Sequence, residues 1–161
     1  MAKRRSKKPK KHIFLIDDLP EEHEFLLIGA QTQQPLHKLA YFFNKNFLTD
    51  FEMQDDIRVI RRKTEVAFQN YATSENEIGQ RMRLLNNEVL IPIEHQQTLF
   101  DTHEAFYLFP ELPAIDYLLM ISYEENLSFE DIKRNFTAPF EVKWIHIDLK
   151  KCYTAFPVFP G

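Results

Sequence analysis

The chain has 161 residues, of which 44% are hydrophobic and 27% are charged, and this is the balance of an ordinary globular domain rather than of a disordered or fibrous chain. Its net charge of −4 is unevenly distributed. Residues 1–11 hold 7 of the 20 basic residues and no acidic residue, which leaves 13 basic against 24 acidic residues in the remainder.

Several function classes conflict with the residue types present. Cys152 is the only cysteine, so neither an intrachain disulfide nor a zinc site built from cysteines can form. Three glycines are too few for a glycine-rich loop that binds phosphates. None of the six histidines forms the i, i+4 pair of a metalloprotease helix. We therefore expect a non-enzymatic protein with no cofactor and no metal.

The apolar segments are too short for a membrane protein. No run approaches the roughly 20 apolar residues of a membrane-spanning helix. The run at Ile13–Ile16 is also far shorter than the apolar core of a secretory signal, which needs about 7–15 residues. We expect a cytoplasmic protein that has no membrane partner.

The first regular elements follow the lead-in at residues 12–18. Residues 24–32 (EFLLIGAQT) predict a strand with a centre apolar enough to be covered on both faces. Pro35 predicts the start of a helix, because a missing N–H costs nothing there. Apolar residues at helical spacing give this helix one buried stripe, formed by Leu36, Leu39, Ala40, Phe43 and Phe47.

The next segment predicts β-structure. Residues 49–56 (TDFEMQDD) read as a loop, and strands follow at 57–60 and 64–71. Residues 82–93 have further β-type apolar residues, interrupted by two adjacent asparagines that predict a turn or a bulge. An antiparallel meander is the simplest arrangement of these strands.

The apolar centre of the second half is residues 106–124. Pro110 and Pro113 forbid a regular central strand between them. Residues 117–122 show almost no alternation of apolar and polar residues, so they predict a strand that is covered on both faces and therefore central.

A helix and a last strand follow. Ser128, with Asp131 three residues later, predicts a helix that begins with a capping box. Its buried side consists of Phe129, Ile132 and Phe136. Pro139 ends this helix, and residues 141–149 (EVKWIHIDL) predict the last strand. A strand–helix–strand order requires a crossover, which makes its two strands parallel.

Together these elements predict an α+β fold. We expect an antiparallel-rich sheet with two helices on one face, in a ferredoxin-like βαββαβ order with extra strands inserted in its middle. We expect residues 1–18 to form a basic, disordered arm and its lead-in, because like charges repel each other and the arm has too few apolar residues to form a core. Residues 19–152 form a single domain, and residues 153–161 form an apolar tail.

Three segments of the chain, at residues 24–29, 38–45 and 109–117, together resemble the IPExxVDY family, a small family of bacterial proteins found in the Bacteroidetes. Residues 24–29 (EFLLIG) are similar to its early strand, and residues 38–45 (KLAYFFNK) to its first helix. Phe109-Pro110-Glu111 with Ile115-Asp116-Tyr117 resembles the motif that names it, although three residues rather than two separate the halves. The family has no assigned activity, so the resemblance implies no catalytic or ligand-binding residue.

Glu111 and Asp116 are the one candidate pair of carboxylates for acid–base chemistry. Such chemistry needs two carboxylates held in a cleft with separated pKa values. The alternative is structural: Glu111 brackets the proline turn, and Asp116 satisfies backbone N–H groups at the start of a strand. We favour the structural role for the whole motif, which comprises Phe109, Pro110, Glu111, Ile115, Asp116 and Tyr117.

The basic arm is the principal functional candidate. Its cations could neutralise phosphates and release counterions, which gives salt-sensitive binding to RNA or DNA without sequence preference. No aromatic residue lies among them, so stacking on bases is not expected. The alternative is a solvated tail that contacts the acidic surface of the protein itself. The candidate nucleic-acid-binding residues are Lys3, Arg4, Arg5, Lys7, Lys8, Lys10 and Lys11.

The sequence leaves two functions of different classes open. The first is a binding protein that associates with RNA or a ribonucleoprotein through its arm. The second is a ferredoxin-like domain that senses a small ligand or a partner and acts as a homodimer, an expectation based on fold analogy. An enzyme that uses Glu111 and Asp116 is disfavoured, because two carboxylates alone do not make an active site.

Overall fold

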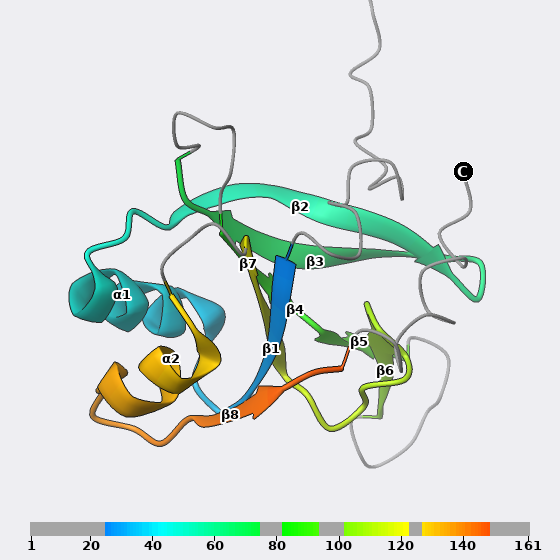
Figure 1. The fold of residues 1–161 in the computed structure, drawn as a ribbon. Helices are drawn as coiled ribbons and strands as arrows, with labels where there is room; N and C mark the ends of the chain where they lie inside the picture. Colours follow the sequence, from blue (N-terminus) through cyan, green and yellow to red (C-terminus); the bar gives the residue numbers. More distant parts are fainter. Residues whose placement is uncertain (1–24, 75–81, 94–101, 123–126, 149–161) are drawn as a thin grey trace, which may run out of the picture.

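The computed structural model describes residues 25–74, 82–93, 102–122 and 127–148, which form an α+β fold with a large and a small antiparallel sheet (Figure 1). This confirms the predicted class. In chain order the elements are β1 (Phe25–Gln31), α1 (Leu36–Phe47), β2 (Glu52–Arg61), β3 (Thr64–Ala72), β4 (Arg83–Asn86), β5 (Glu88–Pro92), β6 (His103–Tyr107), β7 (Tyr117–Ser122), α2 (Phe129–Asn135) and β8 (Lys143–His146).

The large sheet has the strand order β2-β3-β4-β7-β1-β8, and all its neighbouring strands are antiparallel. Because β1 is antiparallel to both β7 and β8, those two strands run in the same direction on either side of it. The parallel relation predicted for them is therefore confirmed, with β1 between them. β5 and β6 pair with each other in a separate two-stranded sheet.

Side chains of the large sheet alternate between two hydrophobic clusters. On β7, Leu119 and Ile121 belong to a cluster that also contains residues of α1 and α2, and we call it the helix-side cluster. Leu118 and Met120 belong to a second cluster, which residues of β5 and β6 join, and we call it the small-sheet-side cluster. β7 is thus buried on both faces, as its unbroken apolar run predicted.

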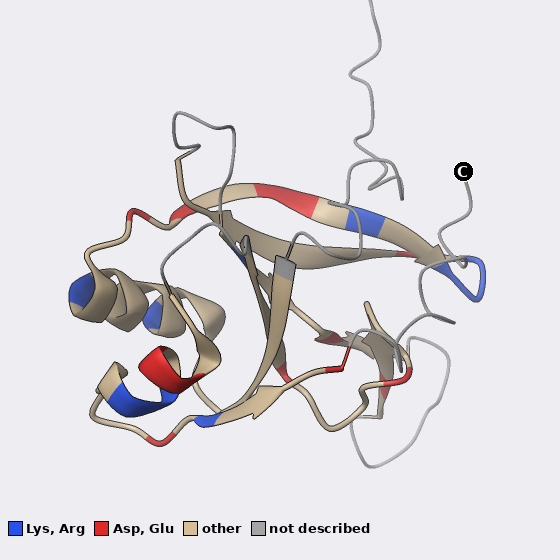
Figure 2. Ribbon diagram, in the orientation of Figure 1, with Lys and Arg blue, Asp and Glu red and all other residues tan. Residues whose placement is uncertain are grey.

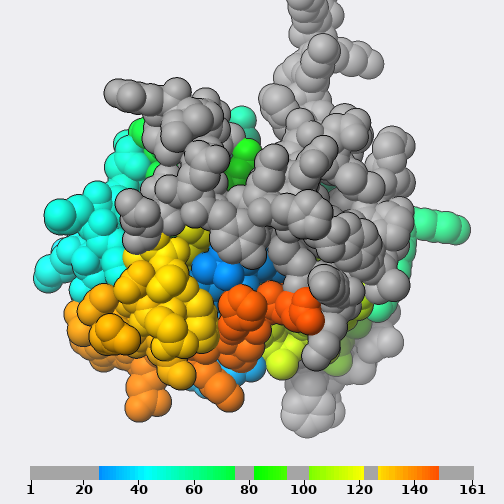
Figure 3. Space-filling model, in the orientation of Figure 1, coloured from blue at the N-terminus to red at the C-terminus, as the bar shows by residue number. Residues whose placement is uncertain are grey.

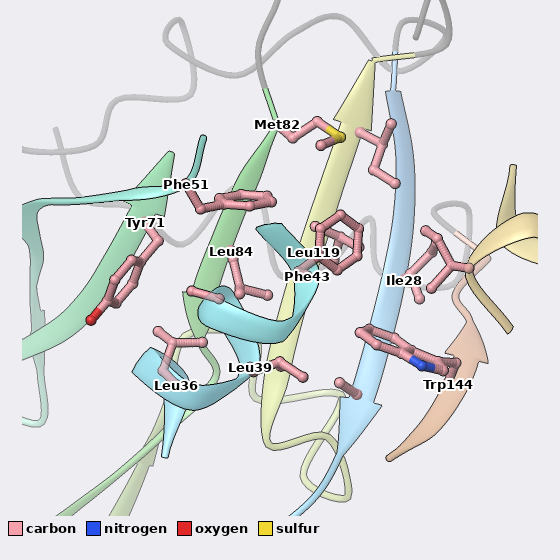
Figure 4. Close-up of a cluster of buried hydrophobic side chains, with 14 of the residues drawn as sticks. Ile28, Leu36, Leu39, Phe43, Phe51, Tyr71, Met82, Leu84, Leu119 and Trp144 are labelled. Atoms are coloured by element: carbon pink, nitrogen blue, oxygen red, sulfur yellow. The ribbon is translucent and has the colours of Figure 1, made fainter. Parts of the chain in front are cut away.

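The helix α1 supplies much of the helix-side cluster. Leu36, Leu39 and Phe43 lie against the side chains of β1, β4 and β7 (Figure 4). The Phe43 ring also meets the ring of Phe51 edge to face, with 5.4 Å between their centres. The helix ends where Leu48 adopts a left-handed conformation, with φ of 53°. The predicted apolar stripe is therefore the packed face of this helix.

The second helix begins with the predicted capping box. The Ser128 hydroxyl accepts a hydrogen bond from the backbone N–H of Asp131, and the Asp131 carboxylate accepts one from the backbone N–H of Ser128. Ile132 is fully buried in the helix-side cluster, whereas Phe129 and Phe136 are partly buried against it. The helix ends at Asn135, before Pro139.

One predicted loop is wrong in its second half. β2 begins at Glu52, inside the segment 49–56 that the sequence predicted as a loop. The first five residues of this strand are all exposed, so no apolar periodicity marks them, and their pairing with β3 alone makes them a strand. The ladder is also irregular between Gln54 and Ile57, where a β-bulge breaks the register.

The paired asparagines mark a change of sheet. β4 ends at Asn86 in the large sheet, and β5 begins at Glu88 in the small one. The interruption was predicted, but the meander continues only through β2, β3 and β4. The last strand is shorter than predicted and spans Lys143–His146.

Candidate functional site

Asn87 organises the turn that contains Phe109, Pro110, Glu111, Ile115 and Asp116, which we call the motif turn. Its side chain is fully buried, and its amide nitrogen donates to the carbonyl oxygens of Leu112 at 2.8 Å and Ile115 at 2.9 Å. Its side-chain oxygen accepts a hydrogen bond from the backbone N–H of Phe109 at 2.9 Å. The backbone of Asn87 adds two bonds, one from its N–H to Asp116 O and one from the N–H of Leu108 to its carbonyl. One buried side chain therefore fixes both halves of the turn.

The second half of the motif joins this turn to the end of β1. The Asp116 carboxylate accepts a hydrogen bond from the backbone N–H of Thr32 at 2.9 Å. The hydroxyl of Tyr117 donates to the carbonyl of Gln34 at 2.6 Å, just before α1. Burial, with a smaller contribution from the charge of Asp116, raises the pKa of the Tyr117 hydroxyl. These contacts hold the backbone that connects β1 to α1.

Ile115 packs on the only glycine within the described strands. A Cβ atom at Gly29 would lie 2.8 Å from Cδ1 of Ile115 and 3.1 Å from Cδ1 of Ile147, which is closer than carbon atoms can comfortably approach. Gly29 therefore leaves the space that Ile115 fills. The close approach of the turn to the centre of β1 depends on this missing side chain.

The two candidate carboxylates differ in their surroundings. Asp116 is partly buried and bonded to the backbone of Thr32, as described above. Glu111 is exposed on the turn. The Asp116 carboxylate thus accepts a hydrogen bond from one backbone N–H group, and the structural role of the motif stays a prediction.

A small pocket of about 270 Å³ lies beside Asp116 and Tyr117. Glu88 also lines it, as does Asn86, whose side-chain oxygen is buried and accepts no hydrogen bond from any residue that the structure describes. The remaining lining residues are Thr32, Pro35, Leu36, Gln69 and Leu90. Two carboxylates and an amide oxygen make this pocket rich in hydrogen-bond acceptors.

A larger cleft of about 870 Å³ lies where the end of β1 approaches α2 and β8. Lys133 of α2 and Lys143 of β8 contribute cations to it, while Trp144 and Phe140 contribute aromatic surface. The Trp144 ring packs edge to face against the ring of Phe136, with 5.1 Å between ring centres. The polar lining of this cleft comes mainly from residues 31–34. Glu141 adds one carboxylate, so the two lysines leave the lining with a net positive charge, which suits an anionic ligand that also has an apolar part.

A basic turn joins β2 and β3, and sequence reasoning did not single it out. Arg61 pairs with Thr64 across the hairpin, so Arg62 and Lys63 form a two-residue turn with φ of 47° and 65°. Positive φ at both central residues is the pattern of a type I′ turn, which follows the twist of the strands. Both side chains are exposed, and the turn projects from the edge of the molecule (Figure 2, Figure 3).

Arg62 and the two arginines of β2 next to this turn contact groups of neighbouring segments. The Nη1 atom of Arg62 forms an ion pair with Glu104 of β6, and its guanidinium lies 5.8 Å from the ring centre of Phe106. Arg61 donates from its guanidinium to the carbonyl of Leu108 at 3.2 Å, and burial lowers its pKa. Arg58 lies 3.8 Å from the carboxylate of Glu65 on the other face of the hairpin.

The histidines in the described part of the chain lie apart from these features. His37, His103 and His146 are exposed, and the ring of His146 contacts that of Phe129 edge to face at 5.7 Å. Among the described residues, no group of three histidine, cysteine, aspartate or glutamate side chains could hold a metal ion. None of the helices in those residues is long and apolar enough to cross a membrane.

Several predicted features lie outside the described residues. These are the seven cations of the arm, the lead-in at residues 12–18, Cys152 and the apolar tail at residues 153–161. Their expected roles stay predictions.

Comparisons with known proteins add no relative. No family model, no curated protein and no solved structure matches the chain. The resemblance to the IPExxVDY family therefore stays a prediction.

Proposed function

We propose that the protein is a cytoplasmic binding protein rather than an enzyme, and that it associates with RNA or a ribonucleoprotein through residues 1–11. The observation that carries this proposal is the concentration of 7 of the 20 basic residues in that segment, without one acidic residue. Such a segment binds phosphates by releasing their counterions. The rest of the chain has more acidic than basic residues and would repel RNA overall. Binding of RNA would therefore depend on residues 1–11.

The contacts of the motif support a non-catalytic reading. Asp116 already accepts a hydrogen bond from Thr32, and Asn87 takes up the polar groups of the turn. These groups stabilise a backbone shape. An acid–base pair would need both carboxylates directed at a shared substrate position.

The test compares the full-length protein with a variant of equal length in which the seven cations are replaced by glutamine. We expect the wild type to bind mixed cellular RNA with an affinity that falls steeply with salt, and the variant to lose this binding. A second variant with residues 2–11 in scrambled order should bind like the wild type, because the interaction depends on charge rather than order. Equal binding by the wild type and the glutamine variant would contradict the proposal.

A second candidate function is binding of a small anionic ligand, and the cleft between β1, α2 and β8 favours it. We propose that the four strands β4-β7-β1-β8 with α1 and α2 on one face represent the ferredoxin-like order, with the β2–β3 hairpin inserted after α1. The strand directions and the shared cluster of both helices support this assignment. Domains of this order can act as homodimers, which is the second expectation from the sequence.

Benzoate and adenosine monophosphate are suitable probes, because each joins an aromatic ring to an anionic group. We expect one of them to raise the melting temperature of the wild type, since a ligand that binds only the native state stabilises it. Replacing Lys133 and Lys143 with glutamine should remove that shift, whereas the same replacement of Lys38 and Lys45 on α1 should keep it. A monomer in light scattering with no thermal shift would contradict this candidate.

A further inference from the structure

The turn between β2 and β3 contains residue types that its backbone disfavours. A type I′ turn prefers Asn-Gly, Asp-Gly or Gly-Gly, because both central residues need a positive φ. Arg62 and Lys63 occupy these positions, with φ of 47° and 65°. A left-handed conformation is unfavourable for a residue with a Cβ atom, because that atom approaches the following carbonyl oxygen. Two adjacent cations therefore occupy positions where the backbone alone would favour asparagine, aspartate or glycine.

Backbone strain of this kind is concentrated at functional positions. We propose that the turn formed by Arg62 and Lys63 is a second contact for nucleic-acid phosphates and that it acts together with residues 1–11. This inference rests on the proposed function, because both elements would bind the same RNA. The turn would supply Arg62, whose guanidinium is already oriented, together with Lys63, and the N-terminal segment would supply further cations.

The geometry of Arg62 suits a phosphate contact. Glu104 engages its Nη1 atom, and the ring of Phe106 lies beside its guanidinium, so the group is oriented before a ligand arrives. The Arg62 side chain nevertheless remains 72% exposed. A guanidinium has five N–H donors, so a single carboxylate leaves donors for a phosphate oxygen.

The charge around this turn is opposite in sign to the net charge of the rest of the domain. Arg58, Arg61, Arg62 and Lys63 lie within six residues, and in the described part of the chain Arg58 and Arg62 form ion pairs with Glu65 and Glu104. The turn is therefore net positive on a chain whose residues 12–161 are strongly acidic. Figure 2 shows this basic end of the hairpin, with acidic residues farther back along β2. The phosphate backbone of a nucleic acid would therefore approach the described part of the molecule most favourably at this end.

The decisive variant replaces Arg62 with asparagine and Lys63 with glycine in the full chain. These residues suit a type I′ turn, so we expect the melting temperature to stay equal or to rise. Binding to a single-stranded RNA should nevertheless weaken, with the slope of log affinity against log salt smaller by about 1.4 and the affinity about 25-fold lower near 0.1 M salt. The matched control replaces Lys38 and Lys45 on α1 with glutamine, which removes the same charge elsewhere.

The outcomes separate this inference from the proposed function. Loss of slope in the turn variant but not in the α1 control supports the inference. Equal loss in both variants, or no loss in the turn variant while the seven-glutamine variant loses binding, overturns the inference and leaves the proposed function intact. If the wild type itself does not bind RNA, both fail.

Discussion

At the scale of single residues, Asn87 shows how one polar side chain determines a local shape. A buried amide is tolerated only when its donors and acceptor are satisfied, and all three are satisfied here by backbone groups of the motif turn. The prolines at 110 and 113 shape the same turn by preventing strand pairing. The turn therefore depends on a residue from another part of the chain.

We predict that Asn87→Ala lowers the free energy of unfolding by about 3 kcal/mol, because it leaves one N–H and two carbonyl groups of the turn, two of these three groups buried and one partly buried, without their partner. Urea unfolding followed by fluorescence of Trp144 measures this change. Asn46→Ala is the control. Asn46 also makes two hydrogen bonds, both with Thr137, but these are exposed, so its loss should cost under about 1 kcal/mol. Equal losses of unfolding free energy in the two variants would show that the loss does not depend on burial of the hydrogen bonds.

The sequence revealed the position of Asn87 but not its role. Two adjacent asparagines in an apolar run predicted an interruption, and the chain does leave the large sheet there. The hydrogen-bond partners lie 22 to 28 residues farther along, and no local pattern connects them. The contact between Gly29 and Ile115 was hidden for the same reason, because it joins residues far apart in the sequence.

At the scale of elements, the capping box formed by Ser128 and Asp131 fixes where the short helix α2 begins and stabilises its first turn. Hydrogen bonds from the backbone N–H and the hydroxyl of Ser128 lower the pKa of the Asp131 carboxylate. A carboxyl group whose pKa is lower in the folded state stabilises the fold above its unfolded pKa, which is about 3.9. This contribution is lost as the pH falls through the folded pKa.

We predict that Ser128→Ala costs about 1 kcal/mol at pH 7, as removal of an N-cap usually does. Asp131→Asn should be less stable than the wild type at pH 7, and this difference should shrink below about pH 4, where the wild-type carboxylate becomes protonated. Urea unfolding at pH 7 and pH 3 tests both statements. Glu130→Gln changes a carboxylate in the same turn but outside the box, and a pH-dependent difference of the same size there would refute this explanation.

Elements with a strong apolar pattern, either a helical stripe or an unbroken run, were predictable, and polar edge strands were not. The stripe of α1 and the apolar run of β7 gave both elements close to their observed bounds. The first half of β2 lies at the sheet edge with every residue exposed, so its strand conformation comes from pairing with β3. The type I′ turn was missed because Arg62 and Lys63 are not residues that signal it.

At the scale of the whole molecule, the apolar core and the basic segments lie in different parts of the chain. The two hydrophobic clusters lie on opposite sides of the large sheet, and the mixed α+β class with an antiparallel sheet followed from the order of predicted elements. The charge asymmetry was also visible in the sequence. The location of the hairpin cations at one end of the molecule needed the three-dimensional structure, because it depends on how β6 brings Glu104 and Phe106 to Arg62.

The position of β1 between β7 and β8 has a consequence for the protein as it leaves the ribosome. Phe25 pairs with Ser122, and Ile28 pairs with His146, so β1 is synthesised long before either neighbour exists. At roughly 5–20 residues per second, translation takes on the order of 5–20 s to supply β7. The β2–β3 hairpin is local and can close first. The nascent chain must therefore keep the apolar β1 and α1 out of wrong contacts during that interval, and the domain can be completed only after synthesis has passed β8.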